Sequence, residues 1–294
     1  MRLSRIPSIE IKTPGQFALM REAGLVVARM LAATAAAAEP GVSTAELDAI
    51  AEREMKAAGA RSSFKGYHGY PATICTSVND QIVHGIPSPA VSLAAGDVLS
   101  IDAGAIVGGW HGDAAVTVAV GALPEQTAAL LRACELAMWQ GLAAAVAGAR
   151  LTDISHAIQA SALASGRYGV VREYTGHFIG SQMHMEPPVP NYGRPGRGPV
   201  LAEGMALAIE PMLVLGAPHT TMLEDGWTVV TADGSLAAHF EHTVAVTADG
   251  PWVLTAEDGG AAGLALGGAS AGARDAAAVA AVARDASPSG AGRP

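Results

Sequence analysis

Two aspartates interrupt a β-hairpin that is otherwise apolar, and this constrains the fold more than any other feature. Residues 96–120 read GDVLSIDAGAIVGGWHGDAAVTVAV, with a turn at Gly108-Gly109 between two valine-rich strands that carry Asp102 and Asp113. Burying an ionised carboxylate costs several kcal/mol unless the charge is paired. Because the stretch contains no lysine or arginine, we expect a bound cation to pair with both aspartates.

The composition excludes some partners. The 294-residue chain has a net charge of −9, whereas nucleic-acid binding needs a basic surface, so no nucleic acid is expected. Two cysteines make neither a disulfide framework nor a CxxC zinc module. The N-terminus lacks the apolar run of a signal peptide, and the longest apolar segment, 23–38, is too short to span a membrane. We expect a cytoplasmic monomer that does not bind membranes.

Residues 13–256 are expected to form one folded domain. Residues 1–12 read as an extended leader. Residues 257–294 are rich in Ala, Gly, Ser and Asp, which predicts a disordered tail with at most a transient helix at 275–285. Capping boxes at Thr13–Gln16 and Ser43–Glu46 predict helices to about residue 38 and to about residue 59. β-like sequence at 64–86 leads into the hairpin.

The same order of elements recurs in the second half. Helices are predicted at 124–147 and 153–165, followed by β-like sequence at 174–185 and a Pro/Gly-rich loop at 187–199. Two strands at 206–215 and 241–246 end the series. Each of them carries an acidic residue where an apolar one is expected, Glu210 and Glu241.

The recurrence has measurable offsets. Gly96 to Asp102 repeats as Gly204 to Glu210, a shift of 210 − 102 = 108, and His111-Gly112-Asp113 matches His239-Phe240-Glu241 at a shift of 128. We interpret this as a duplication, although chance matching in an alanine-rich chain is the alternative. Two halves related by a pseudo-twofold would direct all four carboxylates into one cavity.

A histidine completes a metal-ligand set. His177 lies between glycines in the segment YTGHFIG. One imidazole with four carboxylates suits Mn²⁺, Fe²⁺, Co²⁺ or Zn²⁺. Four negative charges balance two divalent ions, and metal pairs about 3.5–4 Å apart lower the pKa of a water for hydrolysis.

The chain resembles the pita-bread metallopeptidases, and among them the type I methionine aminopeptidases. The resemblance covers about residues 13–255. Its motifs are GYHGYP at 66–71, VNDQIVHGIP at 78–87, TGH at 175–177, HMEP at 184–187, IEPM at 209–212, DGWT at 225–228 and FEHT at 240–243. It implies an α+β pita-bread fold with two pseudo-twofold halves. Each half would pack two helices on a curved antiparallel sheet around a central dinuclear metal site.

The resemblance also implies residue roles. One metal is expected on Asp113, His177, Glu210 and Glu241, and the other on Asp102, Asp113 and Glu241. Glu210 would accept the proton of the attacking water, His184 would hydrogen-bond the carbonyl oxygen, and His84 would contact the peptide nitrogen. The side chains expected around the methionine are Tyr67, Tyr70, Cys75, Met183 and Trp227. The implied substrates are N-termini of nascent polypeptides with a small second residue, and ribosome association stays open.

Two positions depart from the family pattern. Phe178 follows the ligand histidine where the family usually has glycine, and Met183 precedes His184 where phenylalanine is frequent. Neither departure removes a ligand, so they leave the substrate preference open and not the reaction. His111 and His239 are expected to lie behind the ligands or to pack the hairpins.

Other functions stay open. A prolidase or aminopeptidase P usually carries an additional N-terminal domain. A type II methionine aminopeptidase has a helical insertion between the last two glutamate ligands, and the interval 241 − 210 = 31 is too short for one. A non-catalytic binding protein with this fold typically loses ligands, and none is lost here.

Overall fold

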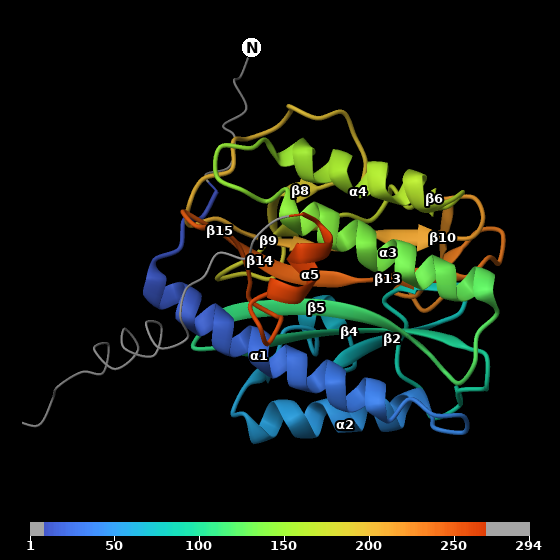
Figure 1. Cartoon of the computed structure of the whole chain (residues 1–294). Helices are drawn as coiled ribbons and strands as arrows, with labels where there is room; N and C mark the ends of the chain where they lie inside the picture. The colour runs from blue at the N-terminus through green and yellow to red at the C-terminus, as the bar shows by residue number, and fades with distance from the viewer. Residues whose placement is uncertain (1–8, 269–294) are drawn as a thin grey trace, which may run out of the picture.

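Two helix pairs flank a curved antiparallel sheet in the computed structural model, which describes residues 9–268 (Figure 1). The first pair is α1 (Pro14–Ala36) and α2 (Thr44–Ala57), and the second is α3 (Glu125–Ala143) and α4 (Leu151–Ser165). Both predicted capping boxes are present at the starts of α1 and α2. None of the helices in this described part of the chain is both long and apolar enough to cross a bilayer.

The largest sheet among the described residues has nine strands. Its central path is β1–β4–β5–β14–β9–β7–β8, with β2 on β4 and β15 on β14. These strands are β1 (Arg61–Ser62), β2 (Ile74–Val78), β4 (Val98–Val107), β5 (Trp110–Ala119), β7 (Gly176–Phe178), β8 (Met185–Val189), β9 (Ala206–Ile209), β14 (Glu241–Thr247) and β15 (Gly250–Val253). The predicted hairpin is therefore β4 and β5, and its turn residues Gly108 and Gly109 have φ of 56° and 87°, as a tight hairpin requires.

Two three-stranded sheets lie beside it, ordered β13–β10–β6 and β11–β12–β3. Their strands are β3 (Gln81–Val83), β6 (Gly169–Val170), β10 (Met212–Val214), β11 (Thr220–Met222), β12 (Val229–Thr231) and β13 (Ala237–His239). Strands β11 and β12 lie in the longer connection of the second half, between β9 and β14.

The halves meet where β5 pairs with β14. Glu241 lies opposite Ala115 and His242 opposite Ala114 in this antiparallel register. Strand β4 begins at Val98 and β9 at Ala206, an offset of 206 − 98 = 108 that repeats the offset found in the sequence.

Each half has its own apolar core. Leu47, Leu99 and Ile101 belong to the first core, and Leu142 and Leu207 belong to the second. Helix α1 packs closely on β5, because a Cβ on Gly112 would lie 2.7 Å from the backbone nitrogen of Gly24. A side chain at this crossing would push the helix off the strand that carries Asp113.

Two predicted elements in the second half differ in the structure. The strand expected at 206–215 is two strands in different sheets, because Pro211 lacks the N–H that would continue the ladder after Glu210. The loop expected at 187–199 begins later, since β8 continues to Val189 through two prolines at its edge.

The predicted disordered tail is ordered at its start. Helix α5 (Ala261–Leu266) packs on α3, and Leu264 is fully buried in the second core. A Cβ on Gly263 would overlap the Trp139 indole, so glycine permits this contact. The prediction is therefore wrong for residues 257–268, because composition alone does not show that one leucine finds a site on α3. The transient helix expected at 275–285 lies outside the described residues.

Candidate metal centre

A single cavity of about 90 Å³ collects the predicted site residues. Thirteen residues line it, and twelve are those that the sequence singled out. The lining consists of Phe64, Tyr67, Tyr70, Cys75, His84, Asp102, Asp113, His177, Met183, His184, Glu210, Trp227 and Glu241. The cavity lies between the two halves, since β2, β4 and β5 contribute from one side, and β7, β14 and the break after β9 contribute from the other.

Strand geometry explains how the carboxylates converge. In the β4–β5 ladder, Asp102 pairs with Ala115 and Asp113 with Gly104. Asp113 is therefore the diagonal neighbour of Asp102, on the same face of the sheet. Glu241 reaches this face across the β5–β14 seam.

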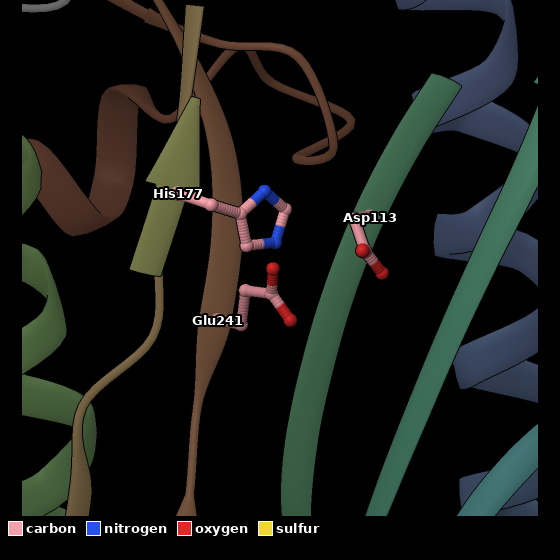
Figure 2. Close-up of side chains that lie close together, drawn as sticks. All are labelled: Asp113, His177 and Glu241. Atoms are coloured by element: carbon pink, nitrogen blue, oxygen red, sulfur yellow. The ribbon is translucent and has the colours of Figure 1, made fainter. Parts of the chain in front are cut away.

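Three ligand atoms are already close together. One atom each from Asp113, His177 and Glu241 forms a group in which all pairs lie within 4.8 Å, and a second such group joins Glu210, His239 and Glu241. Figure 2 shows His177 of β7 facing Asp113 of β5, with Glu241 of β14 between them. Three strands from two halves thus present one hard, oxygen-rich ligand set.

The carboxylates lack the partners that burial demands. Asp102 Oδ1, Asp113 Oδ1 and Glu241 Oε1 are buried and accept no hydrogen bond. Among residues 9–268 no lysine or arginine forms an ion pair with any of the four acids. The basic side chains that lie close to the Glu210 carboxylate are two histidines, His177 at 3.4 Å and His239 at 3.7 Å. An uncompensated buried anion is strongly destabilising, so these residues fit divalent cations.

The pKa values of the four acids also indicate that the buried carboxylates need a cation. Burial raises the pKa of Asp102 to about 7, and Glu210 adds to the shift. Burial and the neighbouring acids raise the pKa of Asp113 and Glu241 well above the ordinary range, and burial does the same for Glu210. A bound cation reverses this effect by favouring the ionised carboxylates.

His177 is arranged as a neutral ligand. Burial lowers its pKa to about 3. Its Nδ1 lies 3.1 Å from the carbonyl oxygen of Phe178, which only accepts, so Nδ1 carries the proton. Nε2 is then free to bind a metal and lies 3.4 Å from Glu210 Oε1. A backbone carbonyl that fixes the tautomer of a ligand histidine is typical of metal sites.

The two other predicted histidines flank the ligands. His184 Nδ1 lies 3.0 Å from the Tyr67 hydroxyl, and its ring lies 4.4 Å from that of His177. His84 has φ of 62° and packs edge-on against Tyr174 and Trp227. Burial lowers the pKa of both histidines, that of His84 to about 4. A strained, left-handed conformation at a non-glycine residue is frequent at functional sites.

An apolar wall closes the cavity beside the metal ligands. Tyr70, Cys75 and Met183 are almost fully buried and pack together. Phe64 belongs to the same cluster and lines the cavity, although the sequence-based list omitted it. The available signal was its place at the head of the aromatic segment 64–86.

Phe178 lies elsewhere. Its ring is buried in the core of the second half and is absent from the cavity lining. Successive residues of a strand point to opposite faces, so His177 faces the site and Phe178 faces the core. The Phe178 ring therefore does not narrow the cavity, whereas Met183 does line it.

The sequence-based list also omitted one residue that supports Glu210. Glu210 lies in the break between β9 and β10, outside the regular ladder. The buried amide of Asn191 donates a hydrogen bond of 3.1 Å to the Glu210 carbonyl oxygen. This bond satisfies a backbone group next to Pro211, and no motif in the sequence pointed to it.

The profile of metallopeptidase family M24 matches residues 18–248. The chain belongs to metallopeptidase family M24. Among its M24 relatives, methionine aminopeptidase 1 of Mycobacterium tuberculosis is 57% identical over 249 residues, which are 83% of this chain and 94% of the relative. Methionine aminopeptidase of Clostridium acetobutylicum is 51% identical, over 84% of this chain and 98% of the relative. The predicted membership of the methionine aminopeptidases is confirmed.

Solved structures confirm the predicted pita-bread fold. The crystal structure of a methionine aminopeptidase from Thermotoga maritima superposes with a TM-score of 0.84 at 41% identity, over 85% of this M24 chain and 100% of the other. A prolidase from Pyrococcus furiosus gives a TM-score of 0.67 at 22% identity, over 84% of this chain and 65% of the prolidase. The likeness to the prolidase is one of fold alone.

Proposed function

We propose that this M24 chain removes the N-terminal methionine from newly made polypeptides whose second residue is small. The observation that carries the proposal is the cavity itself, where five candidate metal-ligating residues, three buried and two half-buried, lie beside a wall of aromatic rings and sulfur atoms. Such a wall suits a thioether side chain. The 57% identity to a methionine aminopeptidase supports the same substrate.

The proposed centre holds two divalent ions, from among Co²⁺, Mn²⁺, Fe²⁺ and Zn²⁺. Asp113, His177, Glu210 and Glu241 would hold one, and Asp102, Asp113 and Glu241 the other. When bound, the ions supply Lewis acidity and a water of lowered pKa. Four carboxylates balance the charge of two such ions, which supports this stoichiometry.

The residues of the chain act on the proton and the peptide. Glu210 accepts the proton of the attacking water, and within residues 9–268 the basic side chains paired with its carboxylate are histidines, not an arginine or lysine. His184, held by Tyr67, donates to the carbonyl oxygen as negative charge develops on it. His84 contacts the peptide nitrogen and assists the departure of the amine.

A cleavage assay with Met-Ala-Ser and an Xaa-Pro peptide tests the proposal, with and without Mn²⁺ or Co²⁺. We expect metal-dependent release of methionine from Met-Ala-Ser. Cleavage of the Xaa-Pro peptide alone indicates a prolidase-like enzyme. Metal binding without turnover of either peptide indicates a binding protein. The proposed site of action is the cytoplasm, and the proposed active form is a monomer. Cosedimentation with ribosomes tests whether the chain acts on nascent polypeptides there.

A further inference from the structure

A second buried histidine lies close to Glu210, at the carboxylate oxygen that His177 does not approach. His239 is 1% exposed, at the end of β13 and two residues before Glu241. Its Nε2 lies 3.7 Å from Glu210 Oε2, whereas His177 Nε2 lies 3.4 Å from Glu210 Oε1. The Glu210 carboxylate therefore has one imidazole at each oxygen.

The main chain of His239 is fixed by the other half of the molecule. Its N–H donates to Thr117 Oγ1 at 2.8 Å, and the Thr117 hydroxyl donates to its carbonyl oxygen at 2.6 Å. Because the Thr117 proton is used in this way, the Ser100 hydroxyl, 2.9 Å away, is the donor to Thr117 Oγ1. A chain of hydroxyls on β4 and β5 thus sets the position from which the imidazole approaches Glu210.

The Nε2 atom of His239 is buried and has no hydrogen-bond partner among the described residues, and a buried polar group left unpaired destabilises the fold. Oε2 of Glu210 is the carboxylate oxygen within reach, and a movement of roughly 0.7 Å brings the pair to ordinary N–H···O length. Hydrogen bonds between catalytic groups are often long in apo structures and shorten when the complex with substrate forms.

We propose that His239 is a positioning residue for Glu210. Its Nε2–H donates to Oε2, which orients the carboxylate so that Oε1 stays on the His177 side, where the first metal is expected. The role rests on the proposed function, in which Glu210 is both a ligand and the proton acceptor. Outer partners of metal ligands typically change metal affinity or activity by about 10–100-fold.

The test compares His239→Leu, which removes the donor, with His239→Gln, which keeps an N–H. His156→Leu makes the same chemical change on the exposed face of α4 and serves as the control. Calorimetry with Mn²⁺ on metal-stripped protein gives the affinity and the number of ions, assays with Met-Ala-Ser give kcat and KM, and circular dichroism checks folding.

We expect His239→Leu to weaken Mn²⁺ binding and lower kcat, each by about 10-fold or more, with little change in KM. His239→Gln should recover both quantities to within about threefold, and the control should match the parent protein. Equal losses in the Leu and Gln variants overturn the proposal, as does the loss of one bound ion, which would make His239 a ligand. If the parent protein binds Mn²⁺ but does not cleave the peptide, only the proposed function is contradicted. The Mn²⁺ affinities of the parent protein and the two His239 variants still decide whether His239 positions Glu210.

Discussion

The hydroxyl of Thr243 holds the main chain of Asp113 from both directions. It accepts the Asp113 N–H at 3.1 Å and donates to the Asp113 carbonyl oxygen at 2.8 Å. The two residues are 130 apart in the chain and belong to different halves. A candidate metal ligand of the first half is thus positioned by a strand of the second, so the geometry of the candidate metal centre depends on the seam between β5 and β14.

Replacing Thr243 by valine tests this dependence. The substitution preserves shape but removes both hydrogen bonds at a fully buried position, so we expect a loss of about 1–3 kcal/mol in the free energy of unfolding. Mn²⁺ affinity should fall with it. Chemical denaturation and calorimetry measure the two effects. Thr221→Val, at an exposed position of strand β11, should change neither quantity. If Thr243→Val also leaves both the stability and the Mn²⁺ affinity unchanged, the metal centre does not depend on the contact between β5 and β14.

Glu210→Gln should nearly abolish turnover. The amide keeps an oxygen for a metal but cannot take the proton of water, and general-base catalysis contributes about 10²–10⁴-fold. We therefore expect kcat on Met-Ala-Ser to fall by that factor while Mn²⁺ still binds. Steady-state kinetics and calorimetry on the same sample measure both. Turnover near that of the parent protein excludes Glu210 as the proton acceptor.

Stability of the metal-stripped protein should decrease as the pH rises above about 7, where the pKa of Asp102 lies. The folded-state pKa values of Asp113, Glu210 and Glu241 lie well above their unfolded values. A raised carboxyl pKa means that the folded state binds more protons, so stability is lost as these groups ionise. The site histidines have lowered pKa values and are neutral in both states above pH 7, so they do not alter the sign.

Added Mn²⁺ should remove this pH dependence, because a cation stabilises the ionised acids. Thermal melting at several pH values, with chelator or with excess Mn²⁺, gives Tm in both series. We expect the gap between the two series to widen as the pH rises. Parallel curves would show that the buried acids are not paired by the metal.

Met183 and Phe178 should separate substrate binding from stability. Phe178→Ala removes a ring from the core and should cost about 3–5 kcal/mol of unfolding free energy, with an unchanged KM for Met-Ala-Ser. Met183→Ala opens the cavity wall and should raise KM by about tenfold or more. Denaturation curves and peptide kinetics on both variants check the pair. A KM effect of equal size in Phe178→Ala contradicts the assignment of its ring to the core.

Leu264 should anchor residues 257–268 to the folded domain. Leu264→Ala removes a fully buried side chain and should destabilise the protein by about 2–5 kcal/mol. Leu266→Ala, on the same helix but 66% exposed, should stay within about 0.5 kcal/mol of the parent protein. Urea denaturation compares them. Equal stabilities would show that α5 does not contribute to the stability of the folded domain.

Local patterns in the sequence determined the parts of this protein that depend on near neighbours. Capping boxes located the starts of α1 and α2, and Gly108-Gly109 located the hairpin turn. Acidic residues inside apolar strands indicated a cation site. A buried carboxylate needs a counter-charge whichever strands pair with its own, so this inference does not require the sheet topology. The 108-residue offset indicated two halves facing one cavity.

The tertiary structure alone decided what depends on residues far apart in the chain. The two-residue period of a strand determines that His177 and Phe178 lie on opposite faces of β7. Only the packing of the whole molecule shows which of these faces is the core. The support of Glu210 by His239 and Asn191, and of Asp113 by Thr243, arises from contacts across strand breaks and between halves. A sequence encodes the period of a strand, whereas its partner and register are fixed by burial over the whole molecule.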